Sequence, residues 1–341
     1  MEFGSDFHMI TSFYSRRAHL TDIYKDIVFF ASGRQTIVAL IAQHQWKRIW
    51  LPVYFCYEVV DTIRQTGIEL LFYPDYPGAY DQNIVSGLPY KEGDVLLRMN
   101  YFGLRTRRSN QSLPIPVIED HSHDLLGRWS LYSDADWCIA SIRKTLPTIE
   151  GGMVWSPKQH RLECMPQATK ENTQMATLRY DAMLLKAEYL TGADIDKEVF
   201  RKLYIDSEER FGHLPLSAIC EQDEEYIHKF DINRWYNQKR TNLKVFEDMK
   251  LQGCRVLHAE CNTCNVFSLL LSFDNTEKRD VARKEFIKRQ VYTSILWRIP
   301  EKRCKTAVEQ SKSILSVHVD GRYSEQEMVM LKTILEQVIN Q

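Results

Sequence analysis

The chain has 341 residues, of which 44% are hydrophobic and 26% are charged. This length predicts two domains or one large α/β domain with an appendage, and the composition is that of a folded protein rather than a disordered one. The 44 Lys and Arg residues balance the 45 Asp and Glu residues, which gives a formal net charge of -1. No overall basic field therefore favours nucleic acid or an anionic membrane surface. The longest apolar runs, such as residues 37–42, are far shorter than the ~20 residues of a membrane-spanning helix.

Residues 1–8 contain the dipeptides Glu-Phe, Gly-Ser and His-Met, which common cloning sites encode. We assign these residues to an expression vector and leave them out of the fold prediction. The start of the chain has no apolar stretch of about 7–15 residues that would indicate a signal peptide. We therefore expect a cytoplasmic protein whose eight cysteines are reduced thiols.

Cys261 and Cys264 form a C-x-x-C motif without a second ligand pair, so we interpret them as the approach to a buried strand rather than as a zinc site.

Helix and strand patterns alternate from about residue 27 to residue 154. Apolar residues at helical spacing predict helices over residues 35–45 and 57–66. Short apolar runs bounded by proline, glycine or polar residues predict strands at residues 49–51, 68–73, 94–99, 116–119, 137–141 and 152–155. This alternation is typical of a mainly parallel, doubly wound sheet.

The later part of the chain has a different pattern. Amphipathic, charged segments predict helices over residues 175–190, 197–210 and 233–251. Further strands are expected at residues 255–260, 266–273, 292–297 and 314–319, and further helices at residues 276–290 and 324–339. We therefore predict a large α/β domain over residues 9–232, a small C-terminal α+β domain over residues 233–341, and a helical layer between them.

The first cluster that suggests chemistry is Ser32, Gly33 and Arg34, directly before the first predicted helix. Small residues at a helix start allow backbone N–H groups to approach an anion, and a guanidinium adds a charge-assisted hydrogen bond. Taken alone, the same pattern is more typical of an ordinary helix N-cap.

Two more clusters follow predicted strands. Asp120, His121 and His123 come at the end of one strand, where ligands bind in open α/β sheets, and they are also compatible with a metal site or a plain polar strand end. Ser141 and Lys144 end the next strand. An isolated lysine is most often a solvated surface residue, but an activated one is a nucleophile.

Together the three clusters match the needs of pyridoxal 5′-phosphate (PLP). An acid pairs with the protonated pyridine nitrogen and keeps the ring an electron sink. A lysine binds the aldehyde as a Schiff base and later moves a proton, and an anion cradle holds the phosphate.

The chain resembles the DegT/DnrJ/EryC1/StrS family of PLP-dependent aminotransferases, which have the fold-type I architecture. The resemblance extends from about residue 27 to residue 338 and rests most specifically on the Asp120 and Lys144 motifs. The matching stretches are residues 32–34, 51–56, 100–103, 118–123, 141–152 and 314–324.

The resemblance implies a role for each matching residue. Lys144 is the Schiff-base lysine, Asp120 is the partner of the pyridine nitrogen, and His123 lies near the cofactor's 3-oxygen. The cofactor's phosphate is then held by Ser32, Gly33, Arg34 and Ser141.

Relatives of this family carry an aromatic residue that stacks on the cofactor ring, and the matching position here is Cys56. The resemblance therefore leaves Tyr54, Phe55 or Tyr57 to supply the ring. No metal ligand set is expected. Trp297 and Arg298 are candidates for the substrate side, although they also fit a strand that ends in exposed side chains.

The resemblance implies a ping-pong transamination from an amino acid, glutamate or glutamine, to a keto sugar that is linked to a nucleotide. Family members that act as dehydratases lack the lysine, so Lys144 favours amino transfer. A homodimer with active sites at its interface is also implied.

Three alternatives remain. The acceptor could be a non-sugar ketone or a cyclitol, or the protein could bind PLP without turnover. The third alternative is a metal hydrolase built on Asp120, His121 and His123, although the sequence has no H-E-x-x-H motif.

Overall fold

The computed structural model of the chain describes residues 2–4, 6–15, 19–79, 81–163, 165–212, 214–262 and 264–341. Cys164 lies outside these residues, as does Thr263, which is part of the C-x-x-C motif. Met1 and Ser5, in the segment assigned to a vector, also lie outside them. The seven cysteines in the described part of the chain are free thiols.

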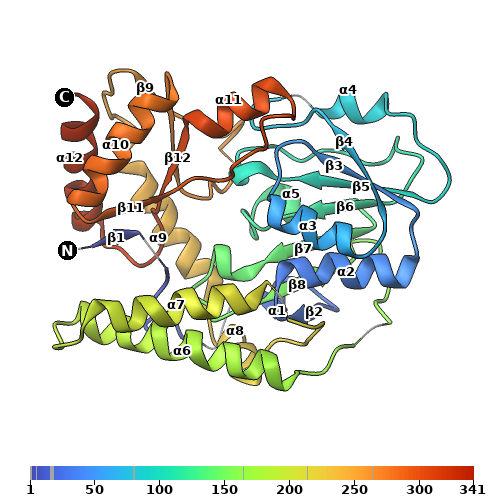
Figure 1. Cartoon of the computed structure of the whole chain (residues 1–341), viewed down its shortest axis with the longest axis horizontal. Coiled ribbons are helices and arrows are strands. Elements are labelled where there is room, and N and C mark those ends of the chain that lie inside the picture. Colours follow the sequence, from blue (N-terminus) through green and yellow to red (C-terminus); the bar gives the residue numbers. More distant parts are fainter. Residues whose placement is uncertain are drawn as a thin grey trace.

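A seven-stranded sheet forms the centre of the larger part of the molecule, as far as the described residues show (Figure 1). Its strand order is β2-β8-β7-β6-β5-β3-β4, in which only β8 runs antiparallel to its neighbours. The strands are β2 (Val28–Phe30), β3 (Arg48–Pro52), β4 (Glu69–Tyr73), β5 (Asp94–Met99), β6 (Val117–Asp120), β7 (Trp137–Ser141) and β8 (Gly152–Trp155). The predicted doubly wound, mainly parallel sheet is thus confirmed.

Helices cover both faces of this sheet because its strands are apolar on both sides. Side chains alternate along a strand, so Val95 and Leu97 of β5 enter one core cluster while Leu96 enters another. Helices α2 (Gly33–His44) and α3 (Tyr57–Gln65) follow β2 and β3. The short helices are α1 (Leu20–Ile23), α4 (Asp81–Ser86), α5 (Arg128–Leu131) and α8 (Glu221–Ile227).

A second, five-stranded sheet of described residues has the order β1-β11-β12-β10-β9. Its strands are β1 (Phe3–Gly4), β9 (Cys254–Val256), β10 (Leu269–Phe273), β11 (Val291–Ser294) and β12 (Ile314–Val317). Helices α10 (Thr276–Lys288), α11 (Lys305–Ser313) and α12 (Glu325–Ile339) accompany it. The segment left out of the fold prediction thus contributes an edge strand, in which Phe3 is buried and pairs with Val291.

Helix α9 (Ile232–Lys244) leads from the first sheet to the second and is shorter than predicted. The expectation of a helix up to residue 251 is wrong. Backbone bonds between residues three apart replace the helical ladder, as in the bonds Phe246 N to Leu243 O and Glu247 N to Lys244 O. This turn allows Phe246 to enter the core of the second sheet.

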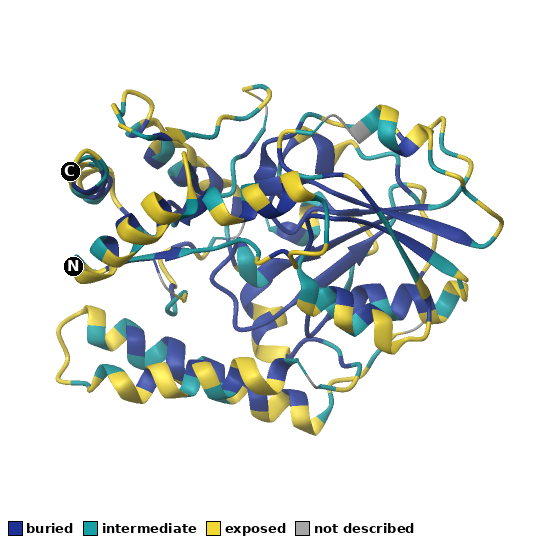
Figure 2. Cartoon of the chain, turned by 45° about the horizontal axis from the view of Figure 1, so that its top comes forward, coloured by how far each residue is buried: buried dark blue, intermediate teal, exposed yellow. Residues whose placement is uncertain are grey.

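Helices α6 (Lys170–Leu190) and α7 (Lys197–Phe211) lie side by side along the bottom of Figure 1. Figure 2 shows that each has an exposed side and a buried side, which is the amphipathic pattern expected for the helical layer. No helix in the described part of the chain is long and apolar enough to cross a membrane.

Candidate active site

The carboxyl ends of β6 and β7 bring Asp120 and Lys144 to the same cavity. Asp120 is the last residue of β6, and Ser141 is the last residue of β7, followed by a 3-10 turn, η2 (Ile142–Lys144), that carries Lys144. Because β6 and β7 are parallel neighbours, both carboxyl ends lie at one edge of the sheet. Asp120 and Lys144 line the same cavity, which has a volume of about 390 Å³.

Most of the predicted site residues line this cavity. They are Ser32, Gly33, Arg34, Phe55, Cys56, Asp120, Ser141 and Lys144. Phe267, Ser294, Leu296, Trp297 and His318, from the second half of the chain, complete its wall. The cavity therefore lies between the two sheets. A larger cavity of about 870 Å³, beside Arg105 and His258, contains none of the predicted site residues.

Two glycines bring the start of α2 against the ends of β7 and β8. A Cβ atom on Gly33 would lie 2.8 Å from the Ser141 Cβ, and one on Gly152 would lie 2.3 Å from the Ser32 carbonyl oxygen. Glycine is therefore required at both positions for this close approach. The result is that Ser32, Gly33 and Ser141, which are distant in sequence, form one small polar surface.

This polar surface fits a phosphate group. The Ser32 hydroxyl is buried and has no hydrogen-bond partner in the described part of the protein. Buried polar atoms normally have a partner, and a phosphate oxygen at the N-terminus of α2 would supply one. The residues present thus fit the phosphate of PLP.

Asp120 is held in place by the backbone. Its Oδ1 accepts a hydrogen bond from the Ser122 N–H at 2.8 Å, and the Ser122 hydroxyl in turn accepts one from the Ser141 N–H at 2.8 Å. These bonds link the two strand ends. The carboxylate is largely buried but still reaches the cavity, as an acid that pairs with a pyridine nitrogen must.

His123 lies beneath the cavity rather than in its wall. Its Nδ1 accepts a hydrogen bond from the Phe102 N–H at 3.1 Å. Burial and the charge of Lys144 lower its pKa well below the usual value, so the ring is neutral and carries its proton on Nε2. Its Nε2 has no partner in the described part of the chain.

Trp297 separates His123 from the cavity. The two rings stack with centroids 5.3 Å apart and planes inclined at 21°. The Lys144 ammonium nitrogen lies 5.1 Å from the Trp297 centroid on the cavity side. Trp297 thus lines the cavity, whereas Arg298 is exposed and does not line it.

Tyr54 supports this wall from behind. Its ring is fully buried, and its hydroxyl donates a hydrogen bond to the Leu296 carbonyl. Burial raises the pKa of this phenol. Tyr54 does not line the cavity, and Tyr57 stacks on Phe72 instead. Of the aromatic candidates, only Phe55 reaches the cavity, next to Cys56.

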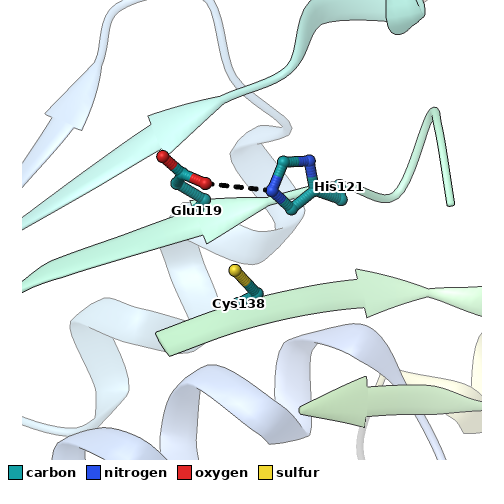
Figure 3. Close-up of side chains that lie close together, drawn as sticks. All are labelled: Glu119, His121 and Cys138. Carbon is teal, nitrogen blue, oxygen red and sulfur yellow. Dashed lines mark hydrogen bonds and ion pairs between the residues drawn. The ribbon is translucent and has the colours of Figure 1, made fainter. Parts of the chain in front are cut away.

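The residues proposed for a metal hydrolase do not converge. His121 points to Glu119 (Figure 3), and its Nε2 lies 3.1 Å from the Glu119 Oε2, whereas the Nδ1 of His123 faces the Phe102 N–H. Glu119, His121 and Cys138 form the single three-residue cluster of possible metal ligands in the described part of the chain. Glu119 already accepts bonds from the side chains of Asn110 and Ser133, so this buried network is a structural support for β6.

The sequence prediction missed several residues of the cavity wall. Arg179 of α6, Glu208 of α7 and Arg143 of η2 line it and were not among the predicted site residues. Arg179 and Glu208 lie on amphipathic helices, where charged residues usually face solvent. Nothing in the local sequence distinguishes them from other polar residues of these helices.

No protein-family model matches the chain, and no curated protein matches it. Solved structures do match. The Helicobacter pylori aminotransferase PseC, involved in the biosynthesis of pseudoaminic acid, is 11% identical with a TM-score of 0.63 over 100% of both chains. DesI, solved in the presence of its TDP-sugar product, is 13% identical with a TM-score of 0.61 over 94% of this chain and 83% of its own.

The PLP form of Spr1654 from Streptococcus pneumoniae is 10% identical to this chain, with a TM-score of 0.61 over 100% of this chain and 99% of its own. These neighbours show that the chain has the fold of PLP-dependent aminotransferases that act on sugars. The fold class predicted from the resemblance is therefore confirmed.

Proposed function

We propose that this protein is a PLP-dependent aminotransferase that moves an amino group from an amino acid to a keto sugar. The observation that carries the proposal is the meeting of Lys144, Asp120 and the Ser32–Gly33–Ser141 surface in one cavity at the strand ends. The fold shared with PseC and DesI supports the choice of reaction and acceptor.

Each of these residues has a role that its position supports. When bound, PLP supplies an electron sink for the carbon that exchanges its amino group. The Lys144 amine would bind the cofactor's aldehyde and would move a proton at the reacting carbon. Asp120 would keep the pyridine nitrogen protonated, and Ser32, Ser141 and the N-terminus of α2 would hold the phosphate. Trp297 forms the part of the cavity wall that lies beside Lys144.

The reaction that we propose needs no external oxidant. The donor, glutamate or glutamine, becomes a 2-oxo acid while the keto carbon of the sugar becomes an amine. DesI with its TDP-sugar product supports a nucleotide-linked acceptor. We further propose that the protein is a homodimer with active sites at its interface, and that it acts in the cytoplasm, where its described free thiols would stay reduced.

The donor half of the reaction tests the proposal directly. The protein supplied with PLP and glutamate should produce one equivalent of 2-oxoglutarate per active site, and the acceptor should then release an amino sugar detectable by mass spectrometry. Lys144→Ala should produce neither. A protein that binds PLP but releases no 2-oxo acid with any amino donor would instead be the binding protein without turnover, and the proposal would be wrong.

A further inference from the structure

Three charged side chains meet at the wall of the cavity, next to Lys144. Arg143 donates two parallel hydrogen bonds to the Glu208 carboxylate, from Nη1 to Oε2 at 2.9 Å and from Nη2 to Oε1 at 2.8 Å. Arg179 adds a third, from Nη1 to Oε2 at 3.3 Å. All three residues line the cavity.

The cations of this cluster are less exposed than the anion. The side chains of Arg143 and Arg179 are 16% and 8% exposed, but that of Glu208 is 45% exposed. The arginines also stack on Phe211 and Tyr204, with guanidinium carbons 4.5 Å and 5.3 Å from the ring centroids. The aromatic rings therefore help to hold both guanidinium groups in place, and Glu208 is the member of the cluster most exposed to solvent.

Asp6 also lines the cavity, and its Oδ1 accepts a hydrogen bond from Arg179 Nη2 at 3.2 Å, so two carboxylates balance the two arginines. Burial would raise the pKa of the Glu208 carboxyl, but the charges of Arg143 and Arg179 outweigh it and lower that pKa. The Nε atoms of both arginines are buried and have no acceptor in the described part of the chain. Arg34, a further cation of this wall, pairs with the exposed Glu58 at 3.4 Å. A carboxylate that replaced Glu208 would therefore find both guanidinium groups in place, with Nε–H donors that Glu208 and Asp6 leave unused.

We propose that Arg143 and Arg179 form the subsite for a carboxylate of an acidic amino donor, and that Glu208 fills this subsite until the donor displaces it. This inference rests on the function proposed above. The Glu208 side chain shows how a donor carboxylate would bind in this subsite. The two parallel bonds that it accepts from Arg143 are the arrangement in which a guanidinium binds a planar carboxylate. A neutral amide in the same place would lack the charge that these buried cations require.

Binding of glutarate, a dicarboxylate that carries no amino group, tests the proposal by calorimetric titration of the PLP-treated protein. Arg143→Met and Arg179→Met should each weaken glutarate binding about tenfold or more, the usual effect of losing a charge-assisted hydrogen bond. Glu208→Gln should strengthen it severalfold, because the internal competitor loses its charge. Glutaramide should bind no variant well.

Arg201→Met is the matched control, since Arg201 lies on the same helix α7 and pairs with Glu198 in solvent. This variant should bind glutarate as the unaltered chain does. Equal binding by all variants, or weaker binding after Glu208→Gln, would overturn the proposal. Thermal melting of each variant shows whether it is folded.

The absorbance band of lysine-bound PLP separates this inference from the proposed function. The band should persist in Arg143→Met and Arg179→Met. Its loss in these variants while glutarate still binds would assign the arginines to the cofactor's phosphate and overturn the inference. Its absence from the unaltered chain contradicts the aminotransferase assignment, whatever the glutarate result is.

Discussion

Asp120 illustrates how much depends on a single carboxylate. It combines an oxygen anchored by the Ser122 N–H with a position on the cavity wall. The anchoring bond needs only an acceptor, whereas stabilising a protonated pyridine nitrogen needs the negative charge. A substitution that keeps the acceptor oxygen but removes the negative charge should therefore affect catalysis and leave the fold intact.

Asp120→Asn is expected to keep the fold and the bound cofactor, because the Asn carbonyl oxygen still accepts from the Ser122 N–H. Turnover should fall by about 10²–10³-fold, as when other single electrostatic partners are removed from active sites. Thermal melting and the steady-state rate of 2-oxoglutarate formation check these two expectations. A variant with an unchanged rate would show that Asp120 is not the partner of the pyridine nitrogen.

At this scale, the sequence predicts the residues that lie in compact motifs. Asp120 and Lys144 each follow an apolar strand, so the parallel sheet brings them together without further information. Arg179 and Glu208 are added by contacts between segments far apart in the chain. Their places depend on how the two sheets and the α6–α7 pair meet, which local patterns do not encode.

At the scale of elements, the junction of α2 with β7 and β8 determines the shape of the cavity. Gly152 lies against the Ser32 carbonyl, and the register pairs it with both Phe30 and Ser141. The atoms that a Cβ on Gly152 would meet are backbone atoms of Ser32 and Gly33. A side chain at this position would therefore have to displace the start of α2, because no flexible side chain is there to move aside.

Gly152→Ala is expected to lower the free energy of unfolding by about 1–3 kcal/mol, the usual effect of overpacking, and to weaken PLP binding. Gly87→Ala is the matched control, because its nearest neighbour is 3.6 Å from the added Cβ. Urea denaturation and absorbance titration with PLP measure both effects. Equal stability of the two variants would contradict the close approach at Gly152.

A buried acid pair supports the turn that leads into Gly152. Glu150 accepts bonds from the Cys220 N–H and the Asn172 amide, and Asp223 accepts bonds from the N–H groups of Ile149 and Glu150. Burial, together with the charge of Asp223, raises the pKa of Glu150 from 4.5 to about 8, and burial raises that of Asp223 to about 7. The folded protein therefore holds protons on this pair that the unfolded chain releases.

Because the folded state binds more protons, the contribution of this pair is fully present below the unfolded pKa and is lost as pH rises toward about 8. Glu150→Gln should remove the part of this pH dependence that belongs to Glu150. Urea denaturation at a series of pH values should show the variant gaining stability over the unaltered chain as pH rises. A gain confined to acidic pH would have the wrong sign and contradict the raised pKa.

At the scale of the whole molecule, the cavity depends on both sheets. Lys144 and Asp120 come from the larger sheet, whereas Trp297 and His318 come from segments around the smaller one. The sequence predicts most strands of the two sheets, since most of them are short apolar runs, but it does not predict β2. It does not predict α11 between β11 and β12, or the edge strand formed by residues of the segment assigned to a vector.

The proposed homodimer is an expectation at this scale. Light scattering of the purified protein should give twice the mass of one chain. A monomer that converts glutamate to 2-oxoglutarate at full rate would show that the site is complete within one subunit and that the interface proposal is wrong.

The central claim, that Lys144 is the lysine that binds PLP, is tested most directly by reduction with borohydride and peptide mapping. Reduction converts a Schiff base into a stable amine, so the peptide that contains Lys144 should carry the pyridoxyl phosphate mass at close to one equivalent per chain. A label on another lysine, or no label while PLP remains bound, would contradict the account.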